Sequence, residues 1–198
     1  MYPLGKQFEV DSTKAKSDKK SIVIGNNYRI SVITERVVRL EFSPTGQFVD
    51  APTQLIKKRR VGLPDYYIRQ DANIVEVTTK YFALSYIKGQ PFVGTKVDKM
   101  KNLKITLLSK DRDRCKDWYF GHPEARNMHG NMVGVDVSIP ENLQRGLYSL
   151  DGFASIDDSL SKIEDSNDRR KYQSLIINAL GTDRIHYGTY TNGQQSGT

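Results

Sequence analysis

The stretch Tyr28–Phe42, YRISVITERVVRLEF, decides the fold class that we predict for this chain. In its first half Tyr28, Ile30 and Val32 alternate with polar residues. Its second half, VVRLEF, repeats the alternation after a short break. A period of two is typical of a strand with one buried face, so the stretch predicts two neighbouring β-strands.

Similar runs continue along the chain, about ten residues apart and separated by turn sequences such as Asn26–Asn27 and Ser43–Gly46. Short strands at this spacing favour an all-β antiparallel sandwich or barrel over a parallel α/β sheet. The further strands that we expect lie at Ser21–Gly25, Tyr66–Arg69, Ile74–Thr78, Phe82–Ile87, Leu103–Leu108, Val135–Ile139 and Phe153–Ile156.

Two regions depart from the strand pattern. Trp118–Gly134 is rich in Gly, Asn, His and aromatic residues, and long irregular segments of this kind are usually functional or cover an edge. Asp168–Leu180 has apolar residues at steps of three and four, which predicts a short amphipathic helix capped by Asp168 and Gly181. We therefore divide the chain into an extended lead-in (1–20), a β-sandwich (21–160) and a C-terminal helix with a polar tail (161–198).

The composition limits the class of protein. The chain has 198 residues, a net charge of +7 and one cysteine, Cys115, so it forms no intrachain disulfide and no cysteine-rich zinc site. Its first residues lack a signal-peptide pattern, and no run approaches the roughly 18 apolar residues of a membrane span. We expect a soluble, cytoplasmic protein without a membrane partner.

The positive charge invites a nucleic-acid interpretation, but neither basic stretch, Lys57–Arg60 or Lys96–Lys116, accompanies a known nucleic-acid motif. Lysine and arginine are common on loops and strand edges, so we expect no nucleic-acid partner. His122 and His129, with Glu124 between them, do not have a known metal-ligand spacing. Phosphate-binding and nucleophile-elbow motifs are absent as well. We expect no metal and no cofactor.

The acidic pair in Asp157–Ser159, DDS, has two interpretations. Paired acids perform acid and nucleophile chemistry in glycoside hydrolysis. Neighbouring residues of a strand point to opposite faces, however, so adjacent acids rarely work together. We favour the alternative, in which DDS ends a strand and its side chains accept hydrogen bonds from nearby backbone amides.

Two stretches resemble the N-terminal region of glycoside hydrolase family 31, the family of α-glucosidases and α-xylosidases. The first stretch matches a family pattern in which a pair of strands contains T-E and then R-L-E. A turn and the motif F-x-D-x-x-T follow. The matching residues of this stretch are Thr34, Glu35, Arg39, Leu40, Glu41, Phe48, Asp50 and Thr53. The second carries W-x-x-G, a middle motif ending in Asp, G-L-x-S-x-D-G-F and D-D-S. Its matching residues are Trp118, Gly121, Asn127, Gly130, Asp136, Gly146, Leu147, Ser149, Asp151, Gly152, Phe153, Asp157, Asp158 and Ser159.

The resemblance implies a galactose-mutarotase-like β-sandwich that precedes a (β/α)₈ barrel. In such enzymes the barrel carries both catalytic aspartates, binds the α-linked oligosaccharide and cleaves it with retention of configuration. The sandwich packs on the barrel and lends a loop to the rim of the sugar pocket. The resemblance therefore implies no catalytic residue in this chain and substrate contacts at Asp136, Asn127 and Trp118.

The chain departs from the family in two ways. Its middle motif reads GNMVGVD, where the family has small residues and Thr-Arg, so the loop differs at the pocket edge. A barrel needs roughly 250 further residues, and the match fades after Ser159.

Two alternatives stay open beside the glycosidase domain. One is a free-standing carbohydrate-binding module that uses Trp118, Tyr119 and Phe120, although core packing also explains these rings. The other is an assembly protein that binds a partner through residues 161–198. The sequence indicates neither the sugar nor the oligomeric state.

Overall fold

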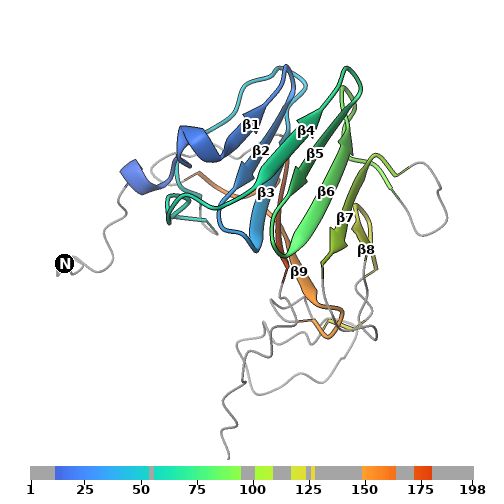
Figure 1. The fold of residues 1–198 in the computed structure, drawn as a ribbon. Coiled ribbons are helices and arrows are strands. Elements are labelled where there is room, and N and C mark those ends of the chain that lie inside the picture. The colour runs from blue at the N-terminus through green and yellow to red at the C-terminus, as the bar shows by residue number, and fades with distance from the viewer. Residues whose placement is uncertain are drawn as a thin grey trace, which may run out of the picture.

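The computed structural model describes residues 12–53, 56–94, 101–108, 117–123, 126–127, 149–163 and 172–179. Within these ranges the chain forms two antiparallel sheets of five strands each, which pack against each other (Figure 1). The predicted fold class, an all-β antiparallel sandwich, is confirmed. Two short 3₁₀ turns, Ser12–Lys14 and Lys19–Ser21, precede the first strand.

The first sheet has the order β1-β2-β3-β10-β9. Its strands are β1 (Ile22–Ile24), β2 (Tyr28–Val32), β3 (Val37–Phe42), β10 (Gln173–Ala179) and β9 (Phe153–Asp157). The turn predicted at Asn26–Asn27 is confirmed, because the amide of Gly25 donates to the carbonyl of Tyr28 at 2.9 Å. At the next turn the Thr34 hydroxyl accepts hydrogen bonds from the amides of Arg36 and Val37, which fixes the β2–β3 hairpin.

The second sheet follows the chain as a meander, in the order β4-β5-β6-β7-β8. Its strands are β4 (Tyr67–Gln70), β5 (Ile74–Thr78), β6 (Phe82–Ile87), β7 (Leu103–Leu107) and β8 (Asp117–Tyr119). The strands predicted from Tyr66 to Leu108 agree with β4 to β7 within two residues. The strand predicted at Val135–Ile139 lies outside the described residues, and β8 falls in the stretch predicted to be irregular.

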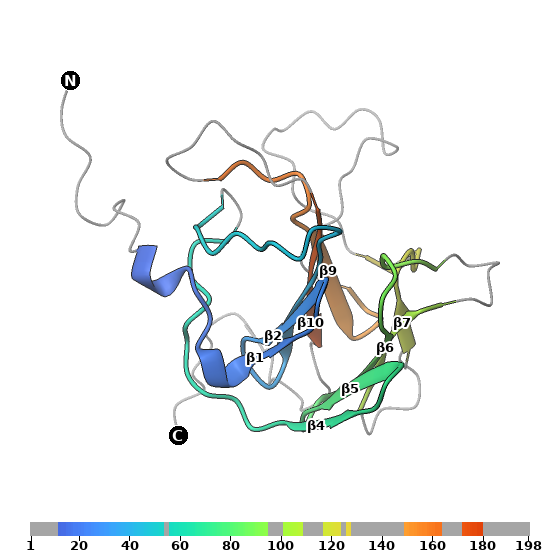
Figure 2. The same cartoon turned by 90° about the horizontal axis from the view of Figure 1, so that it is seen from above.

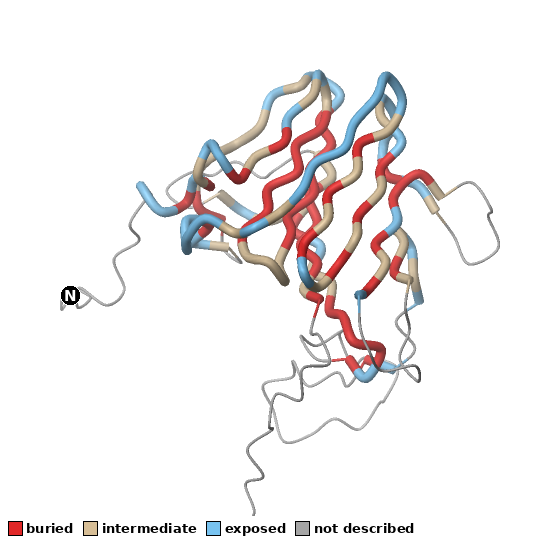
Figure 3. The backbone as a smooth tube through the Cα atoms, in the orientation of Figure 1, coloured by how far each residue is buried: buried red, intermediate tan, exposed pale blue. Residues whose placement is uncertain are grey.

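The apolar core lies between the two sheets. Tyr28 of the first sheet packs against Tyr86 of the second sheet, with ring centroids 5.3 Å apart. Phe42 of the first sheet packs against Phe92, which follows β6, with ring centroids 6.2 Å apart. The buried positions alternate along the inner strands, as the period of two predicts, whereas β4 is exposed along its length (Figure 3).

The helix predicted over Asp168–Leu180 is wrong, because Gln173–Ala179 form the strand β10. β10 pairs with β3 on one side and with β9 on the other, so it is a central strand of the first sheet. Both of its faces are covered, and Leu175, Ile176 and Ile177 are all buried. A strand buried on both faces has a continuous apolar run, which periodicity does not distinguish from a buried helix. The sandwich therefore includes residues that the sequence pattern placed in a separate tail.

The outward face of the first sheet is also buried, although its pattern predicts a half-buried sheet. All five residues of β2 and five of the six in β3 are buried. Residues 43–53 and 56–60, which we name the covering segment, lie on the side of this sheet that faces away from the second sheet (Figure 2). The polar face of β2 and β3 is thus enclosed beneath a loop rather than exposed to water.

Candidate functional site

Trp118, one of the predicted sugar contacts, lies in the centre of β8 and points into the core. Its side chain is 3% exposed, and its partner across the sheet is Ile105. Tyr119 and Phe120 are half-buried. The position of Trp118 agrees with the core-packing alternative, because a ring buried to this extent offers no face to a ligand at the surface.

Asn127, the second predicted contact, forms an isolated β-bridge with Ser149 and is buried. Beside it, the amide of Leu150 donates to the carbonyl of Arg126 at 3.1 Å. The guanidinium of Arg126 lies 3.7 Å from the Asp151 carboxylate, which ties the two segments together. Asp136, the third predicted contact, lies outside the described residues.

Among the residues that the structure describes, the largest set of interacting charges lies beneath the covering segment, on the outward face of the first sheet. We name it the charge cluster, and its members are Arg29, Arg39, Glu41, Asp50, Arg59 and Asp158. All members except Asp50 are buried. Buried charges are tolerated in proteins when they are paired and hydrogen-bonded.

Arg39 stands at the centre of the cluster. Its Nη2 donates to Asp158 Oδ2 at 2.7 Å and to Ser174 Oγ at 2.8 Å, and its Nε lies 3.2 Å from Glu41 Oε1. The Thr53 hydroxyl donates to the second oxygen of Asp158 at 3.1 Å. Arg39 therefore joins β3 to the end of β9, to β10 and, through Asp158, to the covering segment.

Arg29 forms the second centre of the cluster. Its Nε donates to Glu41 Oε2 at 2.7 Å, and its Nη1 donates to Asp50 Oδ1 at 2.6 Å. The Tyr172 hydroxyl donates to Glu41 Oε1 at 3.2 Å and accepts from the amide of Val49 at 2.9 Å. Both oxygens of Glu41 are thus engaged by donors from β2 and from the start of β10.

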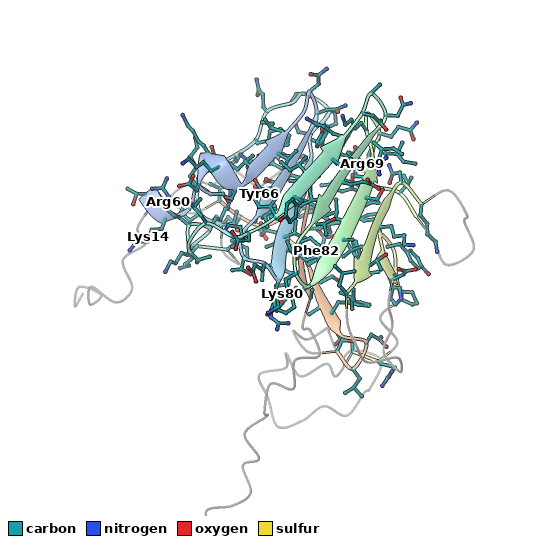
Figure 4. All side chains as sticks on the ribbon, in the orientation of Figure 1. Lys14, Arg60, Tyr66, Arg69, Lys80 and Phe82 are labelled. Atoms are coloured by element: carbon teal, nitrogen blue, oxygen red, sulfur yellow. The ribbon has the colours of Figure 1, made fainter. Side chains whose placement is uncertain are left out.

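Arg59 changes the interpretation of the basic run at Lys57–Arg60. It is 3% exposed, and it donates to the carbonyls of Val49 at 3.3 Å and Ala51 at 3.1 Å. This arginine holds the covering segment together from inside, while the other three cations of the run are exposed. The labelled surface cations, Arg60 among them, are spread over the molecule (Figure 4).

The pKa values in the cluster follow from burial and pairing. Burial alone would raise the pKa of Glu41, but Arg39 and Arg29 outweigh it and hold that pKa below its ordinary value. Burial alone would also raise the pKa of Asp50, but Lys16 and Arg29 outweigh this effect and hold that pKa below its ordinary value. Burial and the neighbouring charge of Arg39 lower the pKa of Arg59 to about 10.

The preferred interpretation of the DDS sequence is confirmed for Asp157, whereas Asp158 accepts from the side chains of Arg39 and Thr53. β9 ends at Asp157, whose carboxylate accepts a hydrogen bond from the amide of Ser159 at 2.9 Å. Asp157 is exposed, whereas Asp158 is 0% exposed and paired with Arg39. The two acids therefore lie in different environments and do not form a working pair.

The charge cluster is suited to a structural role, in which it holds strands and the covering segment together, and not to catalysis. Its buried carboxylates, Glu41 and Asp158, each accept from donors at both oxygens and lie away from solvent. A general acid or base needs access to a substrate proton, which this burial prevents. In the part of the chain that the structure describes, no group of three or more His, Cys, Asp or Glu side chains is arranged to hold a metal ion.

The sequence pattern singled out some members of this cluster and missed others. Five residues of the two resemblance stretches meet here: Arg39, Glu41, Asp50, Thr53 and Asp158. The motifs do not include Arg59, a member of the cluster, or Tyr172, whose hydroxyl donates to Glu41. One signal in the sequence points to the cluster: Arg39 and Glu41 are two residues apart, so they lie on the same face of β3. This spacing does not reveal the segment that covers them.

No helix among the described residues is long and apolar enough to cross a membrane. Comparison of the sequence with models of protein families and with curated proteins returns no match.

Proposed function

We propose that this chain is a non-catalytic β-sandwich domain of an α-glucosidase-like glycoside hydrolase, similar to the N-terminal domain of family 31. In this role it packs on a (β/α)₈ barrel that hydrolyses α-glycosidic bonds. The segment that contains Asp136 contributes to the rim of the substrate pocket. The catalytic nucleophile and the acid/base are residues of the barrel.

The observation that carries the proposal is the ion pair between Arg39 and Asp158. These residues belong to the two separate stretches that resemble family 31, and they are 119 residues apart in the chain. They meet at 2.7 Å with both side chains 0% exposed. Thr53 of the first stretch contacts the same carboxylate. Motif residues that meet in one buried contact support the view that both stretches belong to a single structural pattern.

The fold supports the same proposal. Two antiparallel sheets with a buried polar cluster beneath a covering loop are suited to support a neighbouring domain, and the buried acids Glu41 and Asp158 are engaged in structural contacts. A fold shared with many unrelated functions carries less weight than the motif contact, because β-sandwiches serve many roles.

The proposal is tested by hydrolysis of a chromogenic α-glucoside. The purified 198-residue chain is expected to show no turnover. Activity is expected when the chain is expressed together with the reading frame that follows codon 198, provided that this frame encodes a barrel. Turnover by the isolated chain contradicts a non-catalytic role, and a following frame without a barrel contradicts the proposed parent enzyme.

A carbohydrate-binding module is the alternative, and it calls for a separate measurement. Titration with maltose, isomaltose and xylose oligomers is followed by the fluorescence of Trp118 and by backbone amide shifts near Tyr119 and Phe120. Under our proposal the isolated chain gives no saturable response at millimolar sugar. A saturable response in the isolated chain favours the binding module.

A further inference from the structure

The strand β4 differs from the other strands that end the two sheets. Within the described residues, the edge strands are β1, β4, β8 and β9. Each of the other three contains at least one buried residue, whereas every residue of β4 is exposed (Figure 3). The open side of β4 therefore carries backbone donors and acceptors that can pair with a further strand.

Large apolar side chains are exposed on this edge and just before it. Tyr67 and Ile68 of β4 are 83% and 47% exposed. Val61 and Leu63, in the segment that leads into β4, are exposed as well and line a cavity together with Tyr81. Single exposed apolar residues are ordinary, but a group of them within residues 61–68 is typical of an interaction surface.

The hydrogen bonds at the end of β4 show which of its backbone groups point outward. The amide of Asp71 donates to the carbonyl of Ile74 at 3.0 Å, so these two residues form a bonded pair. Bonded and non-bonded pairs alternate along an antiparallel ladder. Counting back from this pair, Arg69 bonds to β5, whereas Ile68 and Gln70 direct their N–H and C=O groups away from β5.

A second copy of this chain can pair with this edge through a two-fold axis normal to the sheet, which makes the strands antiparallel. The possible registers differ in the residue on the axis. With Arg69 on the axis, two arginines lie directly opposite each other, which is destabilising. With Gln70 on the axis, Asp71 and its successor would have to pair as a strand. The Asp71 carboxylate instead accepts hydrogen bonds from the amides of Asn73 and Ile74, at 2.7 and 2.8 Å, and fixes a turn there.

The register with Ile68 on the axis avoids both conflicts. Ile68 then lies opposite Ile68 of the second copy on the inner face of the sheet, next to the buried Val77 of its own chain. On the outer face, Tyr67 lies opposite Arg69 of the second copy. An arginine beside an aromatic ring is a favourable cross-strand pair, and both side chains are exposed in the single chain.

We propose that two copies of this chain associate through β4, with Ile68 on the two-fold axis, so that their second sheets join into one continuous sheet. The outward N–H and C=O groups of Ile68 and Gln70 form the hydrogen bonds between the copies. A contact of this length belongs with the weak interfaces, which bury less than about 1,200 Å². The association does not depend on the proposed glycosidase role.

Analytical ultracentrifugation of the full chain over a concentration series tests the association. The weight-average mass is expected to rise from that of one chain toward that of two between about 10 μM and about 1 mM. A mass that stays at that of one chain throughout this range overturns the proposal.

Two substitutions at Gln70 separate backbone pairing from the effect of the side chain. Gln70→Pro removes an N–H that β5 does not use, so the chain should fold while the dissociation constant rises by about tenfold or more. Gln70→Ala shortens the side chain but keeps the N–H, and should associate like the unsubstituted chain. Equal association of the two variants contradicts pairing through this edge.

Cysteine cross-linking tests the register without a proline in the strand. With Cys115→Ser as background, Ile68→Cys places opposite Cα atoms about 5.5 Å apart, within the range of a disulfide. Gln70→Cys is the matched control, because its Cα atoms lie about 14 Å apart. Under mild oxidation, Ile68→Cys is expected to form disulfide-linked dimers about tenfold faster or more than Gln70→Cys. Equal rates, or a faster rate for Gln70→Cys, overturn the register.

Discussion

At Asp158 a single carboxylate joins three parts of the molecule, and its removal tests the charge cluster directly. Asp158→Ala leaves Arg39 buried without its main partner, which is expected to lower the free energy of unfolding by about 3–5 kcal/mol. The measurement is urea unfolding at pH 7.

Its neighbour provides the matched control. Asp157→Ala removes an exposed carboxylate that caps the end of β9, which is expected to cost about 1 kcal/mol or less. Equal losses in the two variants would contradict the assignment of Asp158 as the buried anchor.

The acidic residues of the cluster also predict a pH dependence. The pKa values of Glu41 and Asp50 are lower in the folded chain than in the unfolded chain. Their contribution to stability is therefore complete above the unfolded-state values of about 4, and is lost as the pH falls through the lower folded-state values. The urea midpoint should decrease from pH 5 to pH 3, and Asp50→Asn should flatten that decrease. Asp65→Asn, at an exposed position outside the cluster, should leave the slope unchanged.

Among the elements, β10 offers a position that distinguishes a strand from a helix. Helical spacing places Leu175, Ile176 and Ala179 inside and leaves Ile177 outside, whereas in the strand Ile177 is 1% exposed. Ile177→Ala is expected to cost about 2–5 kcal/mol, because it leaves a cavity in the core. On an exposed helix face the same change would be close to neutral. Asn178→Ala, at a half-buried position, is the control and should cost about 1 kcal/mol or less.

The same element shows what the sequence pattern can predict. Strands with one polar face and one apolar face, such as β5 and β6, are predicted to within a residue or two, because a period of two is a strong signal. β10 is buried on both faces, so its period is lost. The charge cluster escapes prediction for a related reason: Arg39 and Glu41 look like solvent-facing residues until the covering segment is placed above them.

For the molecule as a whole, the two sheets share one core, so we expect them to unfold together. The single tryptophan, Trp118, lies in the second sheet, whereas Asp158 is bound to the first. Asp158→Ala should therefore shift the unfolding transition seen by Trp118 fluorescence by the same amount as the transition seen by circular dichroism. A fluorescence transition that stays in place while the circular dichroism transition moves would show that the sheets unfold separately.

The position of β10 also has a consequence for synthesis of the chain. β10 inserts between β3 and β9, and its Ser174 bonds Arg39, a residue made 135 positions earlier. Because the ribosome adds residues in chain order, β3 emerges with one edge open and its arginine without that partner until β10 appears. In the second sheet each strand pairs with the strand that precedes it in the chain, so pairing can proceed as the strands emerge. A nascent chain held on the ribosome before β10 is therefore expected to depend on chaperones that cover open strand edges.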